Sequence, residues 1–158
     1  MSYEQRSIQK RPSLSSPRDV KKVPFVELNA GRLQGVVSSG SDIERVYVSY
    51  IEAGTTNFYC STNNNRPCGG LRGAPCKHLD ALVKEAHLQF SAARIISYLD
   101  LALVPEQISS HRDLVMAIKG GPHKVDASMV FSRFLSYLHY VNLPASNEPL
   151  PEMAWFVQ

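Results

Sequence analysis

The three cysteines of the chain and one of its histidines fall in a single short stretch, with the spacing Cys60-x7-Cys68-x7-Cys76-x-His78. Three cysteines and one histidine are a usual ligand set for a tetrahedral zinc site. Cysteines that serve only as small apolar side chains are instead spread through a core. The spacing therefore predicts a zinc loop with these four residues as ligands. A redox pair with an odd thiol, and three unrelated cysteines, are the alternatives.

The sequence around the second pair of ligands, Pro75-Cys76-Lys77-His78-Leu79-Asp80-Ala81-Leu82-Val83, resembles the SWIM-type zinc finger. That family carries Cys-x-Cys at the end of a strand pair, then a loop, then Cys-x-His at the start of a helix. The first pair departs from this pattern, because Thr62 stands at the place of the family's second cysteine and the next cysteine is Cys68. The resemblance covers residues 33–85. It implies zinc binding and recognition of DNA or protein, often inside a larger assembly.

The spacing of Cys76 and His78 also has a physical reading. Residues two apart cannot share one face of a regular helix. They can reach one metal where one lies just outside a helix and the other lies in its first turn. Pro75 suits such a helix start, and the helix dipole with Lys77 favours the thiolate that zinc requires. An iron–sulfur cluster on the same ligands is an alternative, although the spacing is not that of a ferredoxin.

Four short β-rich segments predict a small antiparallel sheet of three or four strands. They span residues 23–28, 32–37, 45–51 and 57–60, and an Asn-Ala-Gly turn separates the first two. The zinc loop follows the last segment directly. We therefore expect the loop at one end of the sheet.

The rest of the chain has helical periodicity. Apolar residues recur at intervals of three and four from Leu79 to Leu103, which predicts one long helix of about 25 residues that Pro105 ends. A shorter helix is predicted over 112–119 and a last helix over 126–141. We expect the two long apolar stripes to pack on each other. The predicted fold class is α+β: a small antiparallel sheet carrying a zinc loop, followed by a long helix and a C-terminal helical layer.

Charge divides the chain unevenly. Residues 1–22 carry six Lys and Arg against two acidic residues, a net charge of +4, whereas the remainder sums to −1. With several serines, two prolines and few apolar residues, this stretch predicts a disordered basic tail. Residues 23–142 are expected to form the zinc-binding domain, and residues 143–158 a Pro-containing apolar tail.

Composition predicts a cytoplasmic protein that does not contact a membrane. The chain is 44% hydrophobic and 20% charged, as in soluble globular domains. No apolar run approaches the length of a membrane helix, and the first residues lack the apolar core of a secretion signal. Cysteines arranged for zinc rather than for disulfides indicate a reducing compartment.

The remaining polar residues do not form a catalytic pattern. None of the other histidines pairs at motif spacing with a carboxylate or a serine nucleophile; they are His87, His111, His123 and His139. The glycine-rich run from Gly69 to Gly73 lacks the Gly-Lys-Ser/Thr ending of a phosphate loop. We therefore predict a protein that is not an enzyme.

Two sets of residues are candidate contacts with a partner. Arg66, Arg72 and Lys77 give the zinc loop a positive charge, which suits phosphate or an acidic protein surface. Trp155 and Phe156 are large aromatics of the kind that anchor interfaces, or they close the protein's own core. The sequence predicts a zinc-binding adaptor or regulatory protein with a protein partner in a larger assembly. A nucleic-acid-binding protein and a redox or iron–sulfur protein are the alternatives.

Overall fold

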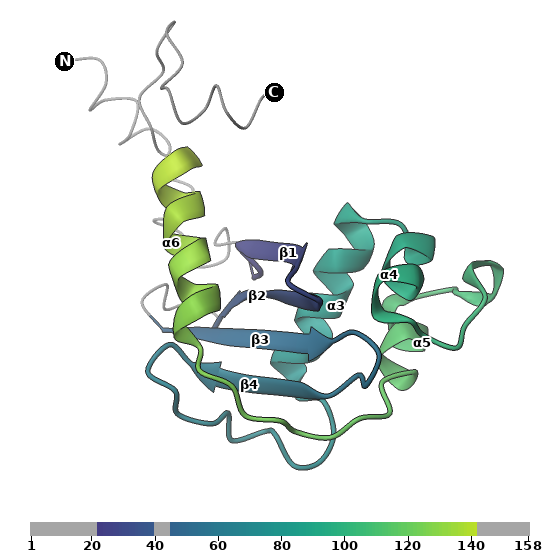
Figure 1. Cartoon of the computed structure of the whole chain (residues 1–158), viewed down its shortest axis with the longest axis horizontal. Coiled ribbons are helices and arrows are strands. Elements are labelled where there is room, and N and C mark those ends of the chain that lie inside the picture. Colours follow the sequence, from purple (N-terminus) through teal and green to yellow (C-terminus); the bar gives the residue numbers. More distant parts are fainter. Residues whose placement is uncertain (1–21, 40–44, 142–158) are drawn as a thin grey trace, which may run out of the picture.

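The computed structural model describes residues 22–39 and 45–141. Within them, four strands form one antiparallel sheet in chain order: β1 (Phe25–Asn29), β2 (Arg32–Ser38), β3 (Val46–Glu52) and β4 (Phe58–Thr62) (Figure 1). All four predicted strands are confirmed, with bounds shifted by one or two residues, and so is the α+β class. Apart from Lys22, the predicted tails 1–22 and 143–158 lie outside the described residues.

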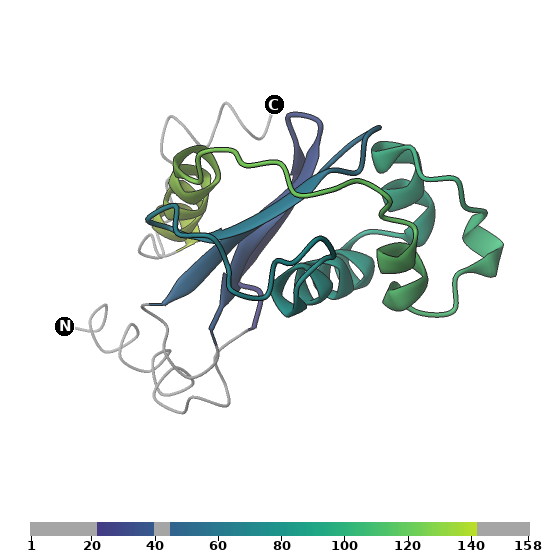
Figure 2. The same cartoon turned by 90° about the horizontal axis from the view of Figure 1, so that it is seen from below.

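Both faces of the sheet are buried. Successive side chains of a strand point to opposite faces, and both alternating sets are apolar here. On one face Leu33, Val37 and Ile51 pack with helix α3 (Lys77–Gln89). On the other face Val36 and Val48 pack with helix α6 (Ser128–Val141). Figure 2 shows the sheet nearly edge-on, with α3 on one side and α6 on the other. The molecule therefore has two separate cores.

The predicted packing of the two long helical stripes on each other is wrong. A sheet that is apolar on both faces needs another element to cover each face. Helix α3 covers one face and helix α6 covers the other. The close approach of α3 depends on Gly35 of β2, since a Cβ there would lie 2.7 Å from Leu82 Cδ1. A larger residue at this position would push the helix away from the sheet.

The predicted single helix from Leu79 to Leu103 is also wrong. The chain forms α3 and then α4 (Ala92–Leu99), with Phe90 extended between them at φ −117° and ψ 153°. The Ser91 hydroxyl accepts the Arg94 N–H at 3.1 Å and so caps α4. A straight helix of 25 residues would be about 38 Å long, far longer than the sheet. Breaking it lets both halves bury their apolar residues in one core.

The later helices follow the prediction more closely. A short 3-10 turn, η2 (Pro105–Gln107), precedes α5 (His111–Met116), which Ser110 and Asp113 cap reciprocally. The segment between α5 and α6, residues 117–127, then crosses from one face of the sheet to the other beside β4 (Figure 1). This crossing places α6 on the face opposite α3.

The outer side of β4 is covered along its length. The Phe58 N–H donates to the Gly121 carbonyl at 3.0 Å, and the His123 N–H donates to the Phe58 carbonyl at 2.8 Å. Further along, the Cys68 N–H donates to the Cys60 carbonyl at 3.0 Å, and the Thr62 N–H donates to the Arg66 carbonyl at 2.8 Å. The loop between β4 and α3, in which the sequence predicts a zinc site, and the segment between α5 and α6 therefore act together as a cover for this edge. At the opposite edge, no other described strand pairs with the outer side of β1.

Candidate metal centre

The structure brings the four predicted ligands together. The sulfurs of Cys60, Cys68 and Cys76 and a ring nitrogen of His78 all lie within 4.8 Å of one another, and all four residues are buried. Four donors around one point, three of them sulfur, form a group that can hold a metal ion. The prediction that these residues converge is therefore confirmed.

The four predicted ligands come from three parts of the fold: strand β4, the loop that follows it, and the start of helix α3. Cys60 lies in β4 and faces the α3 side of the sheet. Cys68 is held beside it because the loop folds back as a short bridge, in which Ser61 pairs with Pro67. Cys76 is the N-cap residue of α3, and its carbonyl accepts the Asp80 N–H at 3.0 Å. His78 is the second residue of that helix. The geometry expected for the Cys76–His78 pair, one just outside the helix and one in its first turn, is confirmed.

The His78 ring is oriented toward the sulfurs. Its Nδ1 lies 3.3 Å from Cys68 Sγ, 3.6 Å from Cys60 Sγ and 3.9 Å from Cys76 Sγ. The Tyr47 ring stacks on one face of this imidazole, with centroids 3.9 Å apart and planes 16° apart. Tyr47 comes from β3, so the sheet fixes the plane of the histidine ring.

Two further groups donate hydrogen bonds to the sulfurs. The hydroxyl of Ser49, a fully buried residue of β3, lies 3.3 Å from Cys60 Sγ. The Gly70 N–H lies 3.4 Å from Cys68 Sγ. Such outer contacts fix the orientation of ligands and disperse thiolate charge. Gly70 also lies close to Cys76, since a Cβ on it would come within 3.4 Å of Cys76 Cβ.

The three thiols affect one another's ionisation. The hydrogen bond from Cys60 is the main cause that lowers the pKa of Cys76, and the same bond, together with burial, raises the pKa of Cys60. Burial raises the pKa of Cys68. As free thiols the cluster therefore ionises at one cysteine much more easily than at the other two. A divalent cation would take the place of the protons and allow all three to bind as thiolates.

The distances fit a tetrahedral ion. With Zn–S bonds of about 2.3 Å and Zn–N bonds of about 2.0 Å, donor atoms around zinc are separated by roughly 3.3–3.8 Å. The distances from His78 Nδ1 to the sulfurs, 3.3–3.9 Å, lie close to this range. All four donor atoms lie within 4.8 Å of one another, so a bound ion would draw the more widely spaced donors together. Sulfur-rich donor sets favour soft and borderline metals over Ca²⁺ or Mg²⁺.

The residues predicted to contact a partner fall into two groups. Arg66 and Arg72 in the loop, and Lys77 at the start of α3, are all exposed beside the buried cluster. Trp155 and Phe156 lie outside the described residues. These three basic side chains are thus available at the surface.

Two histidine–carboxylate pairs were missed by the sequence analysis. His111 Nε2 lies 3.2 Å from both carboxylate oxygens of Asp80 in the first turn of α3. His123 Nδ1 lies 2.9 Å from Glu52 Oε2, and the His123 carbonyl accepts the Tyr50 hydroxyl. The partners are far apart in sequence, so no local spacing could reveal them. The first pair fastens α5 to the helix that carries His78.

A third feature missed by the sequence analysis links the zinc loop to α6. The Asn65 side-chain oxygen accepts the Ala127 N–H at 2.8 Å, next to the start of α6. The Asn65 amide also donates to Asp126 at 3.4 Å. Asn65 itself has a φ of +69°, a conformation that asparagine tolerates better than most residues. One residue therefore connects the loop that carries Cys68 to the start of the helix on the opposite face.

Comparisons of the chain with models of known protein families, with characterised proteins and with solved structures give no match. Over the residues that the structure describes, none of the helices combines the length and the apolar character that crossing a membrane requires.

Proposed function

We propose that this protein is a zinc-binding adaptor or regulatory module without catalytic turnover, whose partner is another protein in a larger assembly. The observation that carries the proposal is the closed, buried set of three sulfurs and one imidazole nitrogen. Structural zinc sites have four protein ligands, whereas catalytic sites keep a position open for water or substrate. The zinc ion is held by Cys60, Cys68, Cys76 and His78 and fixes the loop against the start of α3.

The module is a variant of the SWIM-type finger. In support, Cys60 lies on the second strand of an antiparallel pair, and Cys76 and His78 open a helix. Thr62 replaces the family's second cysteine, and Cys68 takes over as ligand from further along the loop. A direct test is the double substitution Thr62→Cys and Cys68→Ser. Restored zinc content relative to Cys68→Ser alone supports the family relationship, and no restoration argues against it.

A protein partner is favoured because the charge of the folded part is close to neutral. Residues 23–142, the predicted domain, carry 11 Lys and Arg against 10 Asp and Glu, so the domain has almost no overall attraction for a polyanion. The alternative, nucleic-acid binding, depends on the basic residues of the tail and on the exposed side chains of Arg66, Arg72 and Lys77. Three thiolates and Zn²⁺ carry −1, so the loop with its three cations nets +2.

Metal content tests the centre itself. We expect one zinc per chain in the purified full-length protein by elemental analysis, and a colourless solution. Absorbance in the visible with stoichiometric iron would identify an iron–sulfur cluster instead. Intermolecular or internal disulfide formation without any metal would indicate the redox alternative.

Fluorescence anisotropy with labelled duplex and single-stranded oligonucleotides separates the two binding classes. For an adaptor we expect no binding at low salt. For a nucleic-acid binder, deleting residues 1–22 weakens binding and flattens its salt dependence, because six basic residues are lost together. Arg66→Ala and Arg72→Ala then weaken it further. Lys124→Ala is the matched control, since it removes the same charge from an exposed position outside the zinc loop.

Cross-linking in the native host, followed by mass spectrometry, identifies the protein partner. Cross-links that disappear in Arg66→Ala or Arg72→Ala but persist in Lys124→Ala place the contact at the zinc loop. If no partner-specific cross-link is found and oligonucleotides bind tightly, nucleic-acid binding becomes the favoured function and the adaptor role the alternative.

A further inference from the structure

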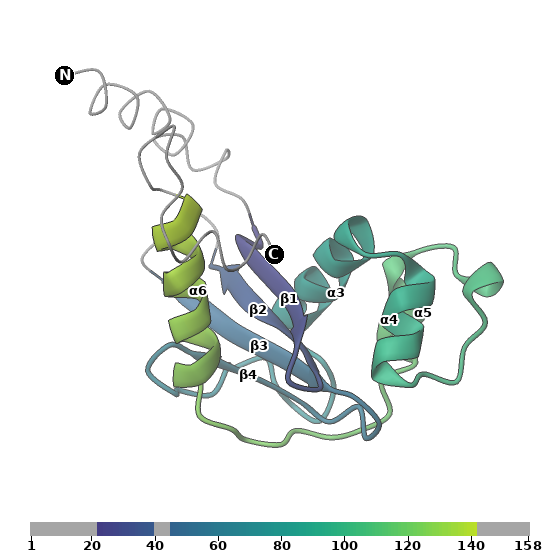
Figure 3. The ribbon, with the colours of Figure 1, turned by 45° about the horizontal axis from the view of Figure 1, so that its top comes forward.

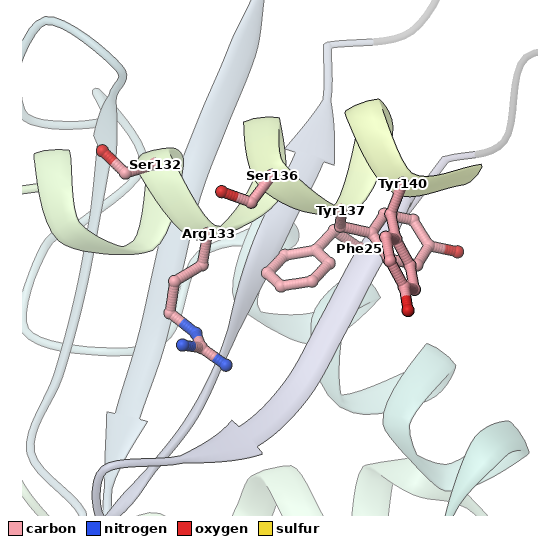
Figure 4. Close-up of a pocket in the computed structure, with 6 residues that line it drawn as sticks. All are labelled: Phe25, Ser132, Arg133, Ser136, Tyr137 and Tyr140. Carbon is pink, nitrogen blue, oxygen red and sulfur yellow. The ribbon is translucent and has the colours of Figure 1, made fainter. Parts of the chain in front are cut away.

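A groove lies between α6 and the edge strand β1, on the face of the sheet opposite the metal centre. It has a volume of about 420 Å³ and mostly apolar walls. Figure 4 shows its lining side chains, which come from one strand and one helix: Phe25, Ser132, Arg133, Ser136, Tyr137 and Tyr140. The groove therefore has room for a large aromatic side chain and lies beside a strand.

The groove is aromatic at one end and charged at the other. The Phe25 and Tyr137 rings have centroids 5.3 Å apart. Arg133 donates two hydrogen bonds to the Glu27 carboxylate, at 2.5 and 2.8 Å, and this pairing raises the pKa of Arg133. Because Glu27 already satisfies the guanidinium, the groove offers chiefly apolar surface to an occupant.

The strand beside the groove has an open edge. The Ala53 N–H donates to the Gly31 carbonyl, so every second residue of β2, counted from Gly31, directs its backbone N–H and C=O toward β3. The residues of β2 between these direct their backbone groups toward β1. In β1, the backbone groups of Val26 and Leu28 therefore point away from β2, toward the outer edge. Among the described residues no strand pairs with this side (Figure 3). An unpaired edge beside an apolar groove is the arrangement that receives an extended peptide as an added strand.

The chain itself continues from the end of this groove. Tyr140 lines the groove, Val141 ends α6, and a further 17 residues follow. The fourteen residues from Val141 to Trp155 can reach about 45 Å when extended, whereas the stretch of α6 beside the groove is only about 12 Å long. The tether is therefore ample for the chain to turn back along β1.

The end of the chain also has the right chemistry. Trp155, Phe156 and Val157 are residues that favour strands. Pro144, Pro149 and Pro151 prevent a continuous helix, and no proline follows Pro151, so each later residue has an N–H for pairing. Residues 1–21, by contrast, are mainly polar and basic and offer little to an apolar groove.

We propose that residues 153–157 of this chain add to the outer edge of β1 as a fifth strand and place Trp155 in the groove between β1 and α6. Phe156, pointing the other way, faces the α3 side of the sheet. The inference is independent of the metal and of the function proposed above, since it concerns the other face and edge of the sheet.

Trp155 is the only tryptophan of the chain, so its fluorescence reports on this site directly. We expect blue-shifted emission that acrylamide quenches poorly in the full-length protein. Ser136→Arg fills the groove from an exposed position on α6 and should shift the emission to the red and raise quenching several-fold. His139→Arg puts the same side chain on an exposed part of α6 outside the groove and should change neither. Unchanged circular dichroism and zinc content in both variants verify folding.

Amide exchange tests the strand pairing. The N–H groups of Val26 and Leu28 should be protected in the full-length protein and exchange many-fold faster in Ala154→Pro, which removes a donor from the added strand. The amides of β3 serve as the internal reference, because they are paired in either case.

Three results would overturn the proposal. The first is red-shifted, readily quenched Trp155 emission in the full-length protein. The second is protected emission that Ser136→Arg leaves unchanged, which places Trp155 elsewhere. The third is protection that depends on protein concentration together with a dimer in sedimentation velocity, which makes a second copy the source of the strand.

Discussion

Tyr47 and His78 form a flat stack in which the ring from β3 covers the imidazole that faces the three sulfurs. Substitution of Tyr47 with Ala removes the wall that fixes the ring plane, and we expect zinc affinity to fall by about 10–100-fold, as for other outer-shell partners of metal ligands. Tyr47→Phe keeps the stacking ring and should bind zinc like the unmodified chain. Competition with a chromophoric chelator measures both. Equal affinity in the Ala and Phe variants would remove the positioning role.

Cys76→Ser should release the zinc and unfold the loop together with the first turn of α3. Cys76 is a predicted ligand at the N-cap position of that helix, so losing its bond to the metal detaches the loop at the helix start. Elemental analysis and thermal unfolding measure the two effects. A chelator should reproduce the fall in unfolding temperature in the unmodified chain and leave the variant unchanged. Full zinc content in Cys76→Ser would rule out its assignment as a ligand.

Gly35→Ala should lower the free energy of unfolding by about 3 kcal/mol, at the upper end for overpacking. The new Cβ would lie 2.2 Å from the Phe25 carbonyl oxygen and 2.7 Å from Leu82 Cδ1, so both the strand and α3 must move. Gly69→Ala is the control, because nothing lies within 4 Å of its Cβ position. Urea unfolding compares the two. Similar free energies of unfolding in the two variants would mean that α3 can shift without loss of stability.

Asn65→Ala should lower the free energy of unfolding by about 1–2 kcal/mol, since it removes the acceptor for the Ala127 N–H and places alanine at a positive φ. Asn65→Gly removes the same hydrogen bond but accepts the backbone conformation, so it should cost less. Both variants should retain zinc. Chemical denaturation and metal analysis measure these outcomes, and a variant that loses its metal would mean that Asn65 acts on the cluster rather than on α6.

The ligands and the strands were predictable because their information is local. The spacing from Cys60 to His78 and the proline before Cys76 each indicate a structure without reference to the rest of the chain. The break at Phe90 and Ser91 was not predictable from periodicity, because the apolar stripe continues across it with little change of phase. Ser91 caps α4, but in the sequence it is one serine within an otherwise helical pattern, so it could not be recognised as a cap.

Which helix covers which face of the sheet could not be predicted, for a different reason. Tyr47 and Ile51 on one side and Val46 and Val48 on the other show that β3 is apolar on both faces. That pattern indicates two covers, but it does not say which helix takes which face. The pairs His111–Asp80 and His123–Glu52 depend on that choice and on the path of the segment between α5 and α6, so they become apparent only in three dimensions.

The cover over β4 limits how folded copies of this chain could polymerise. Growth of a fibre by strand addition needs two open edges on each molecule, one to accept a neighbour and one to offer to the next. Here residues 121–123 bond both outward backbone groups of Phe58, and the loop after β4 bonds the Cys60 carbonyl and the Thr62 N–H. Of the two edges that the described strands form, β1 alone has no described partner. The fifth strand proposed above would move that edge outward without creating a second one, so edge-to-edge growth would stop at a pair. Loss of the metal would loosen part of the cover, and metal depletion would then carry a risk of aggregation as well as a loss of stability.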